Sequence, residues 1–141
     1  MKKSLPIAIV IALIVIAAAC GPKTGGSVST GKAIKAVTIE NLTATLSSGT
    51  GQIKQGDQEV TLAFTDSSGK PVDVGAVSLN FHMPAMGGMA AMNDAVTFST
   101  TDTPGVYRGK VNIGMAGEWQ AQLAYEGPAG KGKTTFSVPT Q

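Results

Sequence analysis

Apolar residues recur at every second position in several short runs of the chain after residue 33. The runs with the clearest alternation are 60–65, 77–83, 107–115, 119–125 and 134–138. Alternation of this kind is typical of β-strands that bury one face and expose the other. No stretch of this part of the chain keeps the 3.6-residue period of an amphipathic helix, so the pattern predicts an all-β protein.

Turn-forming residues separate these runs, most clearly at 66–71 and 103–105. A long run at 34–46 and a short one at 96–98 bring the expected number of strands to about seven. Seven short strands with turns between them predict an immunoglobulin-like β-sandwich, or a related Greek-key barrel, over residues 33–141.

The composition agrees with this fold and excludes one class of function. Charged residues make up 14% of the chain and aromatic residues 5%, so the core must consist mainly of aliphatic side chains and methionine. The formal net charge is +2, and removing Lys2 and Lys3 with a cleaved leader leaves nine basic residues against nine acidic ones. A neutral domain lacks the basic surface that nucleic-acid binding requires, so we expect no nucleic-acid partner.

The first twenty residues have the organisation of an export signal. Two lysines open the chain, an apolar segment follows at 5–19, and three alanines precede Cys20. The apolar segment is shorter than the roughly 20 residues of a membrane span. The arrangement resembles a bacterial lipoprotein signal peptide, in which the cysteine becomes lipidated and N-terminal after cleavage. Cys20 is the only cysteine in the chain, and lipidation accounts for it.

We therefore expect a signal peptide at 1–19 and a lipidated cysteine with a flexible linker, rich in glycine and serine, at 20–32. The alternative is an uncleaved anchor with an inert thiol at Cys20. Either arrangement places the domain in the cell envelope, on the extracytoplasmic side of a membrane.

The most distinctive segment is 82–92, which reads His-Met-Pro-Ala-Met-Gly-Gly-Met-Ala-Ala-Met. A methionine occurs at every third position, namely Met83, Met86, Met89 and Met92. Thioether sulfur is a soft ligand that suits Cu(I), and it can hold the ion in an oxidising compartment because it forms no disulfide. Pro84 ends the strand, and Gly87 and Gly88 allow the chain to turn back. The segment therefore predicts a copper-binding loop, with Cu(I) preferred.

Two other interpretations of this segment stay open. The methionines could form the buried stripe of a short helix, although Gly87 and Gly88 would cost such a helix about 2 kcal/mol. They could also form an adaptable surface that contacts another protein without metal.

Two more residues are candidate ligands. His82 is the only histidine, and its strand phase is opposite to that of Met83, so both can reach one ion only if the chain bends at Pro84. Met115 lies far away in sequence. If each connection reverses the chain direction, the strands that end near Met83 and Met115 run the same way, and both residues lie at one end of the sandwich. Met115 is therefore a candidate ligand or a lid over the site, with packing in the core as the alternative.

The sequence offers no catalytic arrangement. With one histidine, no second cysteine and scattered carboxylates, neither a nucleophile with its base nor a zinc site can be assembled. We therefore expect that the protein is not an enzyme.

The stretch 55–138 resembles the YtkA-like domain family, which includes relatives of FixH. The similarity lies in Gly69-Lys70-Pro71-Val72, Met83-Pro84-Ala85-Met86-Gly87, Pro104-Gly105-Val106-Tyr107 and Met115-Ala116-Gly117-Glu118-Trp119. The resemblance implies an immunoglobulin-like sandwich in the cell envelope that takes part in copper handling or in the assembly of copper-dependent oxidases. It also implies that Met83, Met86 and Met115 are ligands.

Two functions of different classes follow. The first is an envelope lipoprotein that binds Cu(I) through its methionine-rich loop and sequesters the ion or delivers it to a copper-dependent oxidase or an efflux complex. The second is an interaction module that docks on such a partner through exposed methionines and without metal. A third, a spacer or adhesion-like sandwich, would leave the methionines without a purpose.

Overall fold

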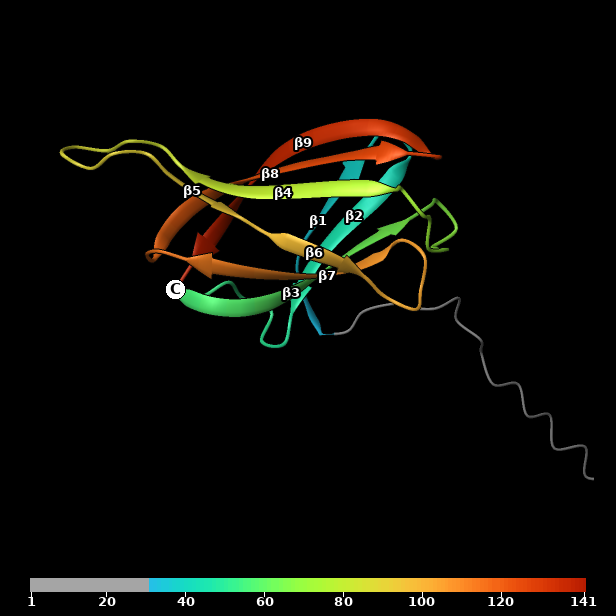
Figure 1. Cartoon of the computed structure of the whole chain (residues 1–141), viewed down its shortest axis with the longest axis horizontal. Helices are drawn as coiled ribbons and strands as arrows, with labels where there is room; N and C mark the ends of the chain where they lie inside the picture. The colour runs from blue at the N-terminus through green and yellow to red at the C-terminus, as the bar shows by residue number, and fades with distance from the viewer. Residues whose placement is uncertain (1–30) are drawn as a thin grey trace, which may run out of the picture.

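Nine antiparallel strands form two sheets that pack face to face in the computed structural model, which describes residues 31–141 (Figure 1). The strands are β1 (Lys32–Ile39), β2 (Leu42–Ser48), β3 (Gly56–Thr65), β4 (Ala76–Met83), β5 (Met92–Ala95), β6 (Thr97–Thr100), β7 (Val106–Ile113), β8 (Gly117–Gly127) and β9 (Gly130–Thr140). One sheet has the order β1-β2-β3-β7-β6 and the other β5-β4-β8-β9. The expected all-β sandwich is confirmed. The expected signal peptide, Cys20 and most of the linker lie outside the described residues.

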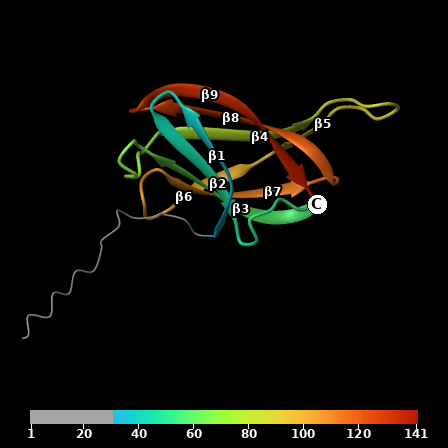
Figure 2. The same cartoon turned by 180° about the vertical axis from the view of Figure 1, so that it is seen from behind.

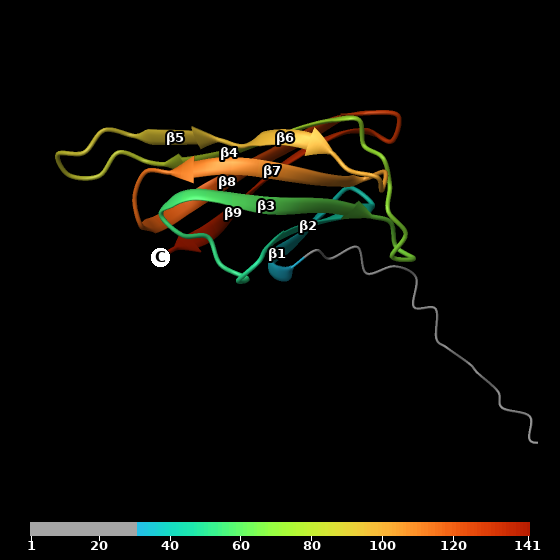
Figure 3. The same ribbon diagram turned by 60° about the horizontal axis from the view of Figure 1, so that its bottom comes forward.

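The chain crosses from one sheet to the other three times, after β3, β5 and β7. At the second of these crossings, strand β5 leads almost directly into β6 of the other sheet. Figure 3 shows these two short strands following one another along one side of the sandwich. Both are edge strands, so this side of the molecule is formed by a single stretch of chain.

The predicted number of seven strands is wrong in two places. The run 34–46, expected as one strand, is the hairpin of β1 and β2, in which Ile39 pairs with Leu42. Glu40 in its turn has a φ of 55°, a left-handed conformation uncommon for a residue other than glycine. The second place is β5, because Met92 was expected to end the methionine-rich loop and no strand was expected at 93–95.

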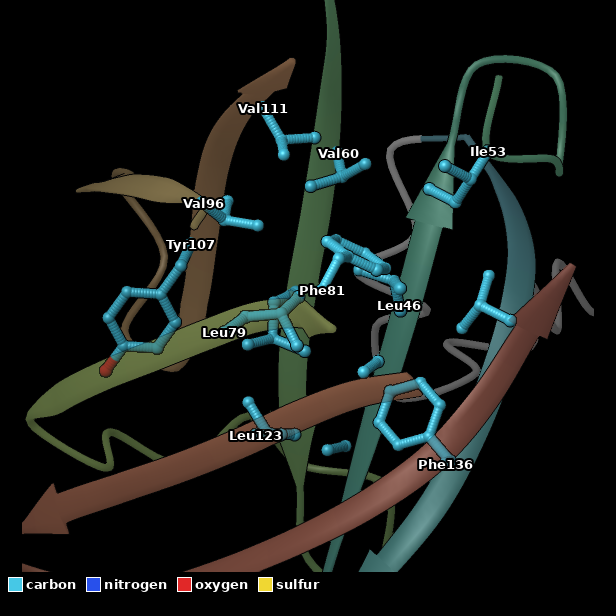
Figure 4. Close-up of a cluster of buried hydrophobic side chains, with 14 of the residues drawn as sticks. Leu46, Ile53, Val60, Leu79, Phe81, Val96, Tyr107, Val111, Leu123 and Phe136 are labelled. Atoms are coloured by element: carbon cyan, nitrogen blue, oxygen red, sulfur yellow. The ribbon is translucent and has the colours of Figure 1, made fainter. Parts of the chain in front are cut away.

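The core lies between the sheets and consists of the inward-facing residues of both. Figure 4 shows part of this cluster, with Phe81 and Leu79 of β4 facing Val60 of β3 and Leu46 of β2. Trp119 is completely buried, as are Phe64 and Phe81. The positions that alternate in the sequence are the positions that are buried, so the period of two correctly predicted which face of each strand forms the core.

Tyr107 ties this core to the connection between β3 and β4. Its hydroxyl donates a hydrogen bond to the carbonyl oxygen of Gly75 at 2.9 Å and also lies 3.3 Å from the carboxylate of Asp73. Burial raises the pKa of Tyr107, and the nearby Asp73 carboxylate raises it further. The hydroxyl therefore stays protonated at neutral pH and keeps its role as a donor.

The hairpin that joins β4 to β5 projects beyond the end of the two sheets. Figures 1 and 2 show it as a narrow arm that extends away from the body of the sandwich. The connection between β7 and β8 lies at the base of this arm (Figure 1). Within residues 31–141 no helix is long and apolar enough to cross a membrane.

Candidate metal centre

The four regularly spaced methionines lie on a β-hairpin and form two pairs. Met83, the last residue of β4, is the cross-strand partner of Met92, the first residue of β5. Further out, Met86 and Met89 exchange two backbone hydrogen bonds, of 3.2 Å and 2.9 Å. Gly87 and Gly88 form the turn between them, and Gly87 has a left-handed φ of 57°. The helical interpretation of this segment is therefore wrong.

The side chains of the inner pair, Met83 and Met92, point toward the connection between β7 and β8. The terminal methyl carbon of Met83 lies 2.9 Å from the place that a Cβ on Gly117 would occupy. The methyl carbon of Met92 lies 2.7 Å from the corresponding place on Gly114. The two glycines flank Met115, so a residue with a side chain at either position would displace one of the methionines.

Met115 therefore lies at the same end of the sandwich as Met83 and Met92, which confirms the expectation from strand direction. Met83 is only 4% exposed, whereas Met92 and Met115 are half-buried and pack against the core. We call Met83, Met92 and Met115 the methionine cluster. The three residues come from β4, β5 and the β7–β8 connection, and their side chains pack in or against the core at this end of the sandwich.

The connection that carries Met115 is held by three side chains from different parts of the chain. The carboxylate of Asp94 in β5 accepts a hydrogen bond from the backbone N–H of Gly114 at 3.0 Å. Gln55 donates to the carbonyl oxygen of Gly114 at 3.0 Å, and the indole N–H of Trp119 donates to the carbonyl oxygen of Met115 at 2.9 Å. The backbone at Met115 is thus fixed before any ligand binds.

Asp94 is a residue of this centre that the sequence interpretation missed. It lies two positions after Met92 on β5, so both side chains point to the same face of the strand. Its bond to Gly114 gives it a positioning role, and its carboxylate also places a negative charge beside neutral thioether groups. Among residues 31–141, no group of three His, Cys, Asp or Glu side chains is arranged to hold a metal ion.

His82 lies on the other face of the sheet from the methionine cluster. Strand β4 alternates regularly up to Met83, so consecutive side chains point to opposite faces. The Nδ1 atom of His82 lies 2.9 Å from the side-chain oxygen of Asn93. The structure therefore does not bring His82 together with Met83.

Met86 and Met89, which we call the tip pair, lie at the end of the arm. Their side chains are 61% and 51% exposed, and they are the large hydrophobic residues that the described part of the chain leaves exposed. The predicted set of methionine ligands is thus divided between a shielded cluster at the base of the arm and an exposed pair at its end.

The fold and this centre define a class: a two-sheet β-sandwich with methionines gathered at one end. Residues 36–124 match the family model described as YtkA-like, and the chain belongs to this family. The match runs from the second half of β1 to most of β8, and so begins earlier than the stretch in which the sequence resemblance was recognised. Membership suggests a copper-related envelope protein and specifies neither a ligand set nor an oxidation state. Comparisons with curated proteins and with solved structures found no match.

Proposed function

We propose that this protein is a lipid-anchored protein of the cell envelope that binds Cu(I) at the methionine cluster and sequesters or delivers it. The observation that carries the proposal is the approach of Met83 and Met92 to the connection that holds Met115. Three thioethers at one end of the sandwich would suit Cu(I) and would offer little to Zn(II) or Ca(II), which prefer nitrogen, thiolate or oxygen ligands.

The surroundings of the cluster favour a monovalent soft cation. Met83 is buried, so water competes poorly for an ion on that side. The Asp94 carboxylate partly offsets the charge of the bound ion, while the uncharged sulfurs add none. Because Asp94, Gln55 and Trp119 fix the backbone at Gly114 and Met115, little ordering is needed when the ion binds.

The test is a competition titration of the full chain against a colorimetric Cu(I) chelator under reducing conditions. Every sample carries Cys20→Ser, because a free thiolate would bind Cu(I) by itself. We expect the chain to withdraw Cu(I) from the chelator and not to withdraw Zn(II) from a zinc indicator. A chain that withdraws no Cu(I) contradicts the proposal.

The anchor is proposed at Cys20, after cleavage of residues 1–19. Labelling of growing bacterial cells with a radioactive fatty acid should mark the mature protein, and Cys20→Ala should abolish the label and leave an uncleaved precursor. A labelled Cys20→Ala protein, or an unlabelled native one, would show that the chain reaches the membrane by another route.

The second candidate function is docking on an oxidase or efflux complex without metal, and the exposure of the tip pair favours it. The same titration separates the two candidates, because a docking module would leave the chelator's Cu(I) untouched.

A further inference from the structure

Met86 and Met89 occupy a position that protein folding does not explain. They are 61% and 51% exposed, and their neighbours Ala85, Ala90 and Ala91 are small and exposed as well. Apolar side chains stabilise a fold by leaving water, and these two contribute little in that way. A hairpin turn requires neither of them, since Gly87 and Gly88 supply the turn itself.

The two residues are nevertheless placed as a pair. Their backbones form a hydrogen-bonded bridge, and directly opposed residues on neighbouring strands have Cβ atoms about 5 Å apart. Two methionine side chains at this separation can bring both sulfur atoms to one ion. Thioethers are ligands that a soft monovalent cation accepts.

The tip pair cannot share an ion with the methionine cluster. Met86 lies three residues beyond Met83, a distance of about 10 Å along an extended chain. The side chains of Met83 and Met92 also point away from the tip of the arm, since their methyl groups lie against Gly117 and Gly114 in the body of the protein. An ion held by the inner pair is therefore out of reach of the outer one.

The two places also differ in charge and in access. Asp94 lies beside the methionine cluster, whereas the segment 83–92 contains no charged residue. An ion at the cluster is shielded from water and lies near a negative charge; an ion at the tip has two neutral ligands and open solvent around it. The tip should therefore bind a cation more weakly and release it faster.

From these observations we infer that the tip pair is a second Cu(I) site, distinct from the methionine cluster, at which the ion is exchanged with a partner. The inference rests on the proposed function. The partner is a Cu(I) acceptor or donor that presents exposed thioether or thiolate ligands, which replace Met86 and Met89 one at a time. The copper stays Cu(I) throughout, so the exchange requires neither an oxidant nor a reductant.

The experiment compares the full chain with Met86→Leu/Met89→Leu, both carrying Cys20→Ser and held in detergent micelles. Equilibrium titration with Cu(I) gives the number of ions bound, and stopped-flow mixing with a methionine-rich acceptor peptide gives the rate of transfer. We expect two ions on the parent chain and one on the variant, with the tighter affinity unchanged and transfer slowed at least about tenfold. Labelling the methionine methyl groups with ¹³C identifies which of them shift as each ion binds.

A third chain, Met86→Ser/Met89→Ser, separates sulfur ligation from apolar docking, because leucine keeps the apolar surface that serine removes. Slow transfer in both variants supports the second site. Slow transfer in the serine variant alone shows that the tip docks without binding copper, and it overturns the inference. A leucine variant that binds as many ions as the parent and transfers them at the same rate also overturns the inference. In that case both chains still bind Cu(I), so the proposed function is unaffected. A parent chain that binds no Cu(I) at all removes the proposed function as well.

Discussion

Replacing Met83, Met92 and Met115 together by leucine is expected to weaken the tight binding of Cu(I) by about a hundredfold or more. Leucine removes every sulfur of the cluster and keeps an apolar side chain of similar volume. Changes to groups that only support metal ligands already cost about 10–100-fold in affinity, so the loss of the ligands should cost at least the upper end of that range. The measurement is the competition titration against a Cu(I) chelator, with every chain carrying Cys20→Ser.

The control for this variant is a measurement of whether it still folds and how stable it is. Exchanges between methionine and leucine usually cost less than about 1.5 kcal/mol each, and Met92 and Met115 are only half-buried. Far-UV circular dichroism and the midpoint of thermal unfolding should show a folded sandwich. A folded variant with the Cu(I) affinity of the parent would show that the cluster is packing and that copper, if bound, lies elsewhere.

Replacing Asp94 by alanine is expected to weaken Cu(I) binding by about tenfold, within the range found for groups that position metal ligands. Alanine removes the acceptor for the backbone N–H of Gly114 and frees the connection that carries Met115. It also removes a negative charge beside Met92. The free energy of unfolding should fall by about 1 kcal/mol, the usual net contribution of one hydrogen bond.

Asp94→Asn separates the two contributions, because asparagine keeps an oxygen that can accept from Gly114 and carries no charge. If the hydrogen bond positions Met115, the asparagine variant should retain most of the affinity and the stability that alanine loses. If asparagine binds Cu(I) as weakly as alanine but unfolds like the parent, the charge is what matters. Unchanged affinity in both variants would exclude Asp94 from the site.

The sequence predicted the sandwich well because side chains on a strand alternate between its two faces, so buried positions recur every second residue. Alternating residues such as Leu79 and Phe81 had to face a core, and they do. The division between β1 and β2 was missed because their turn contains neither glycine nor proline. Glu40 adopts a left-handed conformation there, between the paired residues Ile39 and Leu42, and glutamate seldom adopts it.

The composition of the candidate site was also predictable, but its arrangement was not. Methionines at every third residue predict a copper site. They do not predict which methionines lie opposite one another, because that pairing depends on the register of the hairpin. The register is fixed by the turn at Gly87 and Gly88, which pairs Met86 with Met89 and thereby places Met83 opposite Met92. The role of Asp94 depends on a contact with Gly114, twenty residues further along the chain, and only the fold reveals it.

The hydrogen bond from Trp119 to the carbonyl oxygen of Met115 also gives the protein a built-in optical reporter. Trp119 is the only tryptophan in the chain, it is fully buried, and its indole N–H contacts the backbone of a proposed ligand. Indole emission depends on the polarity and hydrogen bonding around the ring, and all of it would come from this one position. Events at the methionine cluster can therefore be followed in the unmodified protein by its intrinsic fluorescence, whereas events confined to the tip of the arm should leave that signal unchanged.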